Sequence, residues 1–380
     1  MKRWRRIALS VVVVLAAEVV LSALVFPGPG TAATPTVAAA GGPPVSVGAG
    51  ASWRVLYRPS APTGYLTSVV ATSATEAWAG GTVTGSTGET RDWLLLHRIG
   101  RTWRRVRPPE VQAGGPATVA ASGPKNVWVF SGWIQRWDGR RWHEMLSLLI
   151  GQFTPENSPV VLSPSDVWMY GMSFDHRLGH DYCLTRLEHW NGHRWTASSI
   201  KHFCATGLAG SSARNVWLVG QQAPTSSRGR IGAYRFDGRA WRVVRMPHPY
   251  PYSYAGYYTL PTVAVAPSGL AWIGIQSAQP VPGTDYASAL SWNGKRWHTT
   301  PPSPLAAPYT IANDGRGGLW MGPDAHWTGR TWIDTTPPTW FDRGLSYRFA
   351  AMARVPGTAA ILAAGSTNGV PFIAVSGPGG

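Results

Sequence analysis

Short apolar runs alternate with turn-forming residues along most of the chain, and residues 207–245 give a clear example. Residues 207–210 open a first strand, S-S-A-R-N forms a polar turn, and V-W-L-V-G predicts a second strand rich in β-branched and aromatic residues. A longer loop leads to I-G-A-Y-R-F, and D-G then reverses the chain into R-A-W-R-V-V-R. This alternation predicts four antiparallel strands in one unit.

The unit recurs six times with two tryptophans in fixed places. The first tryptophans lie 40 to 55 positions apart, which is typical of propeller blades. They are Trp78, Trp128, Trp168, Trp217, Trp272 and Trp320. The second closes a Gly-x-x-Trp phrase, in which the glycine suits a tight turn that needs a positive φ. These are Trp103, Trp142, Trp195, Trp241, Trp297 and Trp332. We assign all of them to packing between sheets.

A seventh unit is split between the two ends of this repeat region. Residues 347–376 contain three strand candidates with no Gly-x-x-Trp after them. The missing phrase stands at residues 50–59, where G-A-S-W-R-V-L-Y-R-P matches G-R-A-W-R-V-V-R-M-P at 238–247. The sequence therefore predicts an all-β chain, a seven-bladed β-propeller of four-stranded antiparallel blades over residues 51–380, whose last blade is closed by the N-terminal strand.

The alternation of S-x-x-x-x-W-x-x-G with W-D/N-G-x-x-W resembles secreted β-propellers of high-GC Gram-positive bacteria. D-G-R-G-G-L-W-M-G at 314–322 is similar to the propeller repeats of sensor ectodomains. The resemblance covers residues 51–380 and implies the fold. Gly-x-x-Trp also resembles the Asp-box turn of sialidases. It departs from that motif because Asp or Asn directly precedes the glycine and the upstream Ser/Thr is absent, so it does not indicate a sialidase.

The N-terminus has the pattern of an export segment. Lys2, Arg3, Arg5 and Arg6 precede an apolar run at residues 7–26, and small residues follow. Two interpretations stay open: residues 1–33 are a cleaved signal peptide, or residues 7–26 anchor the chain in the membrane. Residues 34–50 predict a flexible linker. In both cases we expect the propeller to be extracellular, either secreted or anchored to the outer face of the cytoplasmic membrane.

Net charge indicates the class of partner, and the two cysteines indicate a disulfide. The formal net charge is +16, which outside a cell suits an anionic wall polymer or lipid head groups better than nucleic acid. Cys183 and Cys204 are the only cysteines, and in an exported chain they predict a disulfide.

One segment has the composition of a contact surface. Residues 248–259, H-P-Y-P-Y-S-Y-A-G-Y-Y-T, link the fourth and fifth units, and their prolines stiffen an aromatic stretch suited to sugar rings or a protein epitope. The candidate ligand-binding residues are Tyr250, Tyr252, Tyr254, Tyr257 and Tyr258. The alternative interpretation is that these rings pack the loop onto the blades.

Catalytic signatures are weak. D-H-x-x-x-H-D at 175–181 could offer metal ligands, but it falls in an expected loop, and we interpret it as a solvated polar segment. We predict no catalytic residue, metal or cofactor. The favoured function is a monomeric extracellular binding or scaffold module that presents a loop-rich propeller face to a cell-wall glycan or surface protein. The alternative is a carbohydrate-active enzyme, a glycoside hydrolase or lyase, with its site in the central depression.

Overall fold

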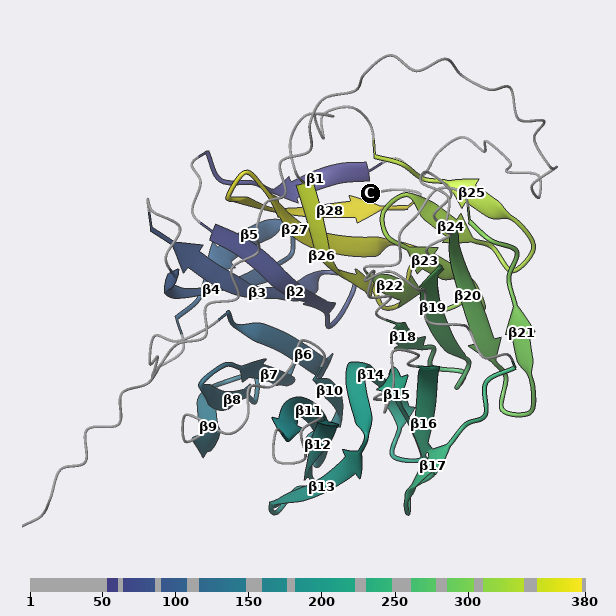
Figure 1. Ribbon diagram of the computed structural model, residues 1–380. Coiled ribbons are helices and arrows are strands. Elements are labelled where there is room, and N and C mark those ends of the chain that lie inside the picture. The colour runs from purple at the N-terminus through teal and green to yellow at the C-terminus, as the bar shows by residue number, and fades with distance from the viewer. Residues whose placement is uncertain are drawn as a thin grey trace, which may run out of the picture. The chain divides into compact units, whose positions relative to one another are not determined.

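The computed structural model describes eleven stretches between residues 53 and 377, and these form seven separate four-stranded sheets (Figure 1). The described residues are 53–60, 64–85, 90–107, 116–147, 159–175, 182–222, 230–247, 261–277, 286–303, 310–337 and 347–377. Each sheet is antiparallel and its strands follow one another in chain order, apart from one sheet that joins the first strand to the last three.

The blades are numbered from the first complete sheet. Blade 1 contains β2 (Gly64–Ala71), β3 (Glu76–Thr84), β4 (Thr90–Ile99) and β5 (Thr102–Arg105). Blade 2 contains β6 (Thr118–Gly123), β7 (Asn126–Phe130), β8 (Trp133–Trp137) and β9 (Trp142–Ser147). Blade 3 contains β10 (Val160–Ser163), β11 (Asp166–Asp175), β12 (Tyr182–Trp190) and β13 (Trp195–Lys201). Blade 4 contains β14 (Phe203–Ser212), β15 (Asn215–Gln222), β16 (Arg230–Phe236) and β17 (Trp241–Val243).

The remaining blades follow the same order. Blade 5 contains β18 (Thr262–Val265), β19 (Ala271–Ser277), β20 (Tyr286–Trp292) and β21 (Trp297–Thr299). Blade 6 contains β22 (Ile311–Asn313), β23 (Leu319–Met321), β24 (Ala325–Trp327) and β25 (Trp332–Asp334). Blade 7 contains β26 (Tyr347–Arg354), β27 (Ile361–Thr367), β28 (Val370–Ser376) and β1 (Trp53–Tyr57).

The first strand of each blade is its inner strand, and these strands form a closed ring. Each of β2, β6, β10, β14, β18 and β22 contacts the next one, and β26 contacts β2 (Figure 1). Strand β1 pairs with β28, with Trp53 opposite Ser376 and Val55 opposite Ala374. The predicted seven-bladed propeller and its closure by the N-terminal strand are therefore confirmed.

The Gly-x-x-Trp phrases are the turns into the outer strands. Glycines 139, 192, 238, 294 and 329 have φ between +91° and +95°, a region that glycine enters at no steric cost. The side chain before the glycine, which is Asp, Asn or Thr328, accepts two backbone N–H bonds. Asp138 Oδ1, for example, is 2.7 Å from the amide nitrogen of Arg140 and 2.8 Å from that of Arg141. The side-chain oxygen thus satisfies amides that the turn leaves without strand partners.

Tryptophan contacts repeat between neighbouring blades. The outer-strand tryptophan of blades 2 to 7 meets the buried first tryptophan of the preceding blade, in most cases edge to face. The measured ring centroid distances are 5.8 Å for Trp142 on Trp78, 6.2 Å for Trp195 on Trp128, 5.5 Å for Trp241 on Trp168, and 5.9 Å for Trp297 on Trp217. Trp332 and Trp272 share one core cluster. The predicted role of the tryptophans in packing between sheets is confirmed for these pairs.

The split blade 7 makes this tryptophan contact with blade 6 but not with blade 1. Trp53, which is 5% exposed, packs edge to face on Trp320 of blade 6 at 5.9 Å and donates its indole N–H to the carbonyl of Thr335 at 2.9 Å. Blade 7 has no first tryptophan, and Leu362 is buried in the cluster against which Trp103 of blade 1 packs.

The predicted disulfide is present. Cys183 lies on β12 of blade 3 and Cys204 on β14 of blade 4, with 5.3 Å between their Cα atoms. Cys204 therefore belongs to an inner strand and not to the link before it, and the bond joins two adjacent blades.

Several predictions concern residues outside the described stretches. They are the export segment at 1–33, the linker at 34–50 and the tyrosine-rich link at 248–259. Within the described residues, no helix is long and apolar enough to cross a membrane.

We expect Trp53→Ala to lower the free energy of unfolding by about 3–5 kcal/mol, because it removes a buried indole from the blade 6–blade 7 contact. Trp53→Phe should cost less, since it keeps an aromatic ring and loses the bond to the Thr335 carbonyl. Urea unfolding measures both. Ile99→Ala, at a side chain that is 66% exposed, is the control and should change stability by no more than about 0.5 kcal/mol. Equal effects of Trp53→Ala and Ile99→Ala would contradict this account of closure.

Candidate functional site

The propeller has two unlike faces. Because antiparallel strands reverse at alternating ends, the turns between the first and second strands and between the third and fourth strands lie on one face. We call this the short-turn face. The other face carries the connections between the second and third strands and between blades, and most of those connections lie outside the described residues.

A polar arrangement that we call a clip supports the short-turn face in blades 1 to 4. In each of these blades, the side chain two positions before the first tryptophan forms a hydrogen bond with a side chain of the third strand. That third-strand residue is the one paired opposite the tryptophan. The four pairs and their distances are Glu76–His97 at 2.9 Å, Asn126–Arg136 at 2.8 Å, Asp166–His189 at 2.9 Å and Asn215–Arg235 at 2.8 Å. In blades 1 and 3 a carboxylate is paired with a histidine, and in blades 2 and 4 an asparagine is paired with an arginine.

In blades 2 to 4 the clip also accepts the indole N–H of the tryptophan. Asp166 Oδ1 accepts the indole N–H of Trp168 at 2.8 Å as well as the bond from His189. The His189 ring is stacked on Trp168 with 3.9 Å between centroids. One part-buried oxygen therefore orients two rings, of which Trp168 packs against Trp241 of the next blade.

Blade 6 pairs an acid with a histidine from a different position. Gly318 stands where blades 1 to 4 have the acid or amide, and an added Cβ there would lie 2.3 Å from Asp314 Oδ2. Asp314 occupies that space and bonds to His326 at 3.1 Å. Burial raises the pKa of Asp314, but bonds from His326 and from the amides of Arg316 and Gly318 outweigh it and hold the pKa below its ordinary value.

The turn carboxylates are also engaged. The bond from His143 and those from the amides of Arg141 and Arg140 hold the pKa of Asp138 well below its ordinary value. The amides of Ala240 and Arg239, together with Arg242, lower the pKa of Asp237 to about 2. These carboxylates are ionised at neutral pH and their oxygens are occupied by protein donors.

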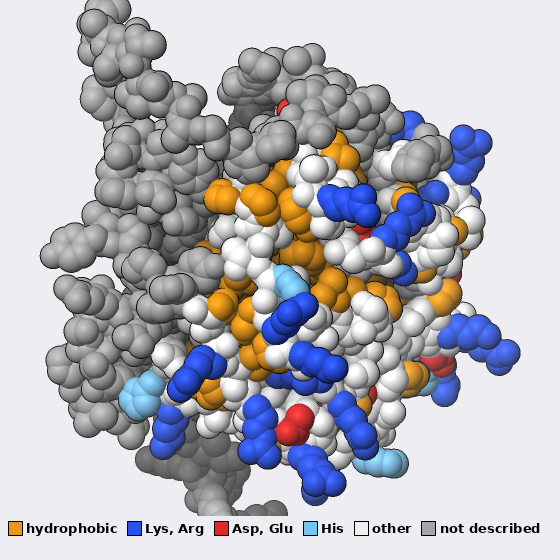
Figure 2. All heavy atoms as spheres, turned by 90° about the vertical axis from the view of Figure 1, so that its right-hand side faces the viewer, with side chains coloured by type: hydrophobic (Ala, Val, Ile, Leu, Met, Phe, Trp, Pro, Cys, Tyr) orange, Lys and Arg blue, Asp and Glu red, His pale blue; other side chains and the backbone are white. Residues whose placement is uncertain are grey.

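Exposed cations recur on the same face, in the turns of blades 1 to 6. They are Arg101, Lys125, Arg140, Arg141, Arg194, Arg214, Arg239, Lys295, Arg296, Arg316 and Arg330. They outnumber the described carboxylates of this face, which are Glu76, Asp138, Asp166, Asp237 and Asp314. A side view of the ring shows Lys and Arg side chains across the described surface with few carboxylates among them (Figure 2). We call the exposed set the basic rim.

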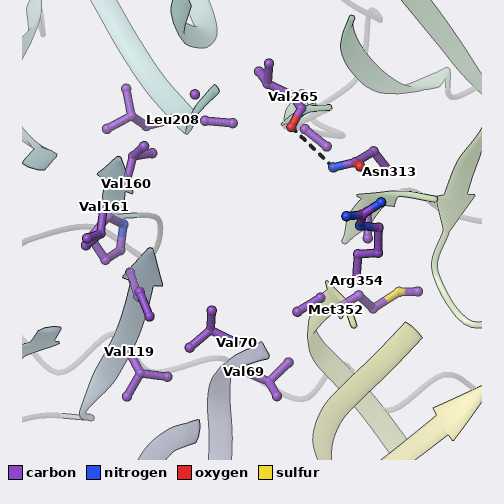
Figure 3. A pocket seen from close by; sticks show the side chains of 18 of the residues that line it. Val69, Val70, Val119, Val160, Val161, Leu208, Val265, Asn313, Met352 and Arg354 are labelled. Carbon is purple, nitrogen blue, oxygen red and sulfur yellow. Dashed lines mark hydrogen bonds between the residues drawn. The ribbon is translucent and has the colours of Figure 1, made fainter. Parts of the chain in front are cut away.

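A cavity of about 310 Å³ lies inside the ring and is lined by all seven inner strands (Figure 3). Its lining comes from the ends of those strands nearest the short-turn face, as with Val70 of β2 and Val265 of β18. The side chains are almost all aliphatic. The exceptions are Asn313 at the end of β22 and Arg354 at the end of β26, which lie beside each other on one wall (Figure 3).

A pair of interacting carboxylates lies elsewhere in blade 6. Burial, with a smaller contribution from the charge of Asp334, raises the pKa of Asp324 to about 6. Asp324 precedes β24 and Asp334 ends the outer strand β25, so neither belongs to the cavity wall. The cavity lining that is described includes no Asp, Glu or His.

The structure brings together few of the predicted site residues. Cys183 and Cys204 are bonded. The five tyrosines Tyr250, Tyr252, Tyr254, Tyr257 and Tyr258 and the histidines of the 175–181 segment lie outside the described residues. No group of three or more His, Cys, Asp or Glu side chains able to hold a metal is found among the described residues. The clips, the basic rim and the Asn313–Arg354 pair were not predicted.

Comparisons with known proteins support the fold. No protein-family profile and no curated protein sequence matches the chain. The polysaccharide lyase Uly1 is similar in structure with a TM-score of 0.51 and 9% identity, over 83% of this chain and 90% of that one. The Pyrococcus horikoshii acylaminoacyl peptidase has a TM-score of 0.51 and 6% identity, over 83% of this chain and 51% of that one. The Aleuria aurantia lectin, a six-bladed propeller, has a TM-score of 0.44 and 14% identity, over 82% and 90%.

The clip predicts a specific rescue. Asp166→Asn leaves His189 facing an amide and should lower the free energy of unfolding by about 1 kcal/mol. Adding His189→Arg recreates the Asn–Arg pair of blades 2 and 4 and should recover most of that loss. A double-mutant cycle in urea should give a coupling energy of at least about 1 kcal/mol. Strictly additive single effects would show that the two side chains do not act as a unit.

Asp324 predicts a pH dependence of stability. Because its pKa in the folded chain is raised to about 6, the folded state binds more protons than the unfolded state between about pH 4 and 6. The stabilising contribution of protonated Asp324 is therefore lost as the pH rises through 6. Asp324→Asn should be more stable than the wild type by about 2 kcal/mol at pH 8, and the difference should vanish near pH 4. Asp334→Asn is the control and should reduce the slope only in part, and a pH-independent difference for Asp324→Asn would contradict the assignment.

Proposed function

We propose that this chain is an extracellular, non-catalytic binding module that holds an anionic cell-surface polymer on its short-turn face. The observation that carries the proposal is the basic rim. Cations project from the turns of six consecutive blades, while the carboxylates between them are engaged by histidines, arginines and backbone amides. A rim of this kind fits an extended polyanion, because each turn offers a charge at a regular interval around the ring.

The interblade disulfide supports the extracellular part of the proposal, since such bonds persist in oxidising compartments. The short turns support the binding part. Asp138 and its counterparts fix the backbone from which the cations project, so little backbone freedom is lost on binding.

The tyrosine-rich link at 248–259 stays a prediction for a second contact, with a glycan or a surface protein, on the opposite face. No observation in the described part of the chain favours the enzyme alternative.

The test compares dextran sulfate with uncharged dextran as probes for the full chain. Arg140→Gln, Arg239→Gln and Arg296→Gln together should weaken dextran sulfate binding about a hundredfold, since each cation near an anionic surface contributes about 1 kcal/mol. The binding constant of the triple variant should also depend less steeply on salt concentration. Neither chain should bind uncharged dextran.

The matched control removes the same charge from exposed positions outside the turns. Arg54→Gln, Arg104→Gln and Arg245→Gln together should change dextran sulfate binding by less than about threefold. Equal losses in the two triple variants would mean that net charge alone drives the interaction. That result, or no binding of dextran sulfate by the wild type at low salt, would contradict the proposal.

A further inference from the structure

Two polar side chains share one wall of the otherwise aliphatic cavity. Asn313 comes from blade 6 and Arg354 from blade 7, and each is the last residue of its inner strand. Figure 3 shows the Arg354 side chain extending along the wall toward Asn313. The other labelled residues on the cavity wall are Val, Leu or Met.

The donors of Arg354 are available. Arg354 forms no hydrogen bond or ion pair with another residue in the described part of the chain. Asp314, the carboxylate next to Asn313 in the chain, already accepts bonds from the amides of Arg316 and Gly318 and from His326. A guanidinium has five N–H donors in a fixed planar arrangement that matches a carboxylate.

The position of Arg354 depends on a glycine. A Cβ added to Gly315 would lie 1.7 Å from Arg354 Nη1, and Gly315 has φ of +74°. Gly317 has a comparable φ of +98°, but a Cβ there would meet nothing within 4 Å. The turn therefore holds two glycines with positive φ. A side chain at Gly315 would collide with the guanidinium of Arg354, whereas a side chain at Gly317 would not.

Asn313 is held in place beside Arg354. Its Nδ2 donates to the carbonyl of Val265 at 3.2 Å, which orients the amide because a carbonyl can only accept. Its Oδ1 is buried and has no surface open to the cavity. The donors that this wall offers a ligand are therefore those of Arg354.

We propose that this cavity is a binding site for a small organic carboxylate. The carboxylate accepts two bonds from Arg354, and the aliphatic side chains of the wall contact the carbon skeleton. Inorganic phosphate fits less well, because it has no carbon skeleton to meet those side chains. The cavity volume of about 310 Å³ is in the range of small-ligand sites. The site goes beyond the proposed polymer binding and does not depend on it.

The probe is glucuronate, titrated calorimetrically into the full chain at 0.15 M salt, with glucose and inorganic phosphate as comparison ligands. Wild type should bind glucuronate at least about tenfold more tightly than either, because only glucuronate supplies both a carboxylate and a carbon skeleton. Arg354→Gln should weaken glucuronate binding at least about tenfold.

A glycine pair keeps the test informative where Arg354→Gln fails to fold. Gly315→Ala should displace the guanidinium and weaken glucuronate binding at least about tenfold, whereas Gly317→Ala, which adds the same methyl to open space, should change it less than about twofold. The basic-rim variant Arg140→Gln, Arg239→Gln and Arg296→Gln should also leave glucuronate binding within about twofold, which separates this site from the polymer surface. Equal effects of the two glycine variants, equal affinity for phosphate and glucuronate, or no glucuronate binding by the wild type would overturn the proposal.

Discussion

The edge-to-face contact between tryptophans of successive blades is the interaction on which the ring depends. Hydrogen bonds hold strands together within a blade, but among the described strands no hydrogen-bonded ladder joins one sheet to the next. The outer-strand indole of one blade covers the buried indole of the blade before it, as Trp195 covers Trp128. Aromatic pairs in this geometry add stabilisation beyond the area they bury. A single phrase repeated in the sequence therefore supplies the contact between neighbouring sheets.

The same phrase explains the charge of the surface. The turn before the outer tryptophan needs a side-chain acceptor, which Asp138 and Asp237 supply while giving up their oxygens to backbone amides. The following positions point outward and carry arginine or lysine. The carboxylates of the short-turn face are therefore hydrogen-bonded within the turns, whereas the cations beside them stay accessible to solvent. Fold and electrostatics are linked through one five-residue turn.

The sequence predicted the fold almost completely because the repeated tryptophans and glycines have the same local role in every blade. Trp53 was recognisable as the missing outer strand since its surroundings match those of Trp241. The acid or amide of each clip was visible two positions before tryptophan, but its partner was not, because strand register decides which residue stands opposite. Asn313 and Arg354 carried no sequence signal. They are neighbours only because the ring brings β22 beside β26, and each replaces a small or apolar residue of the repeat.

Pairing of β1 with β28 has a consequence for how the domain is assembled. During synthesis β1 is made first and its partner last, so Trp53 must wait for Ser376 before the two can pair. Until then the seventh sheet lacks its fourth strand, and β28 has an unpaired edge. Contacts of such long sequence separation form slowly, because the entropy of closing a large loop is lost before the contacts contribute any stabilising free energy. The topology therefore makes blades 1 to 6 depend on local contacts, whereas the final closure depends on the whole chain.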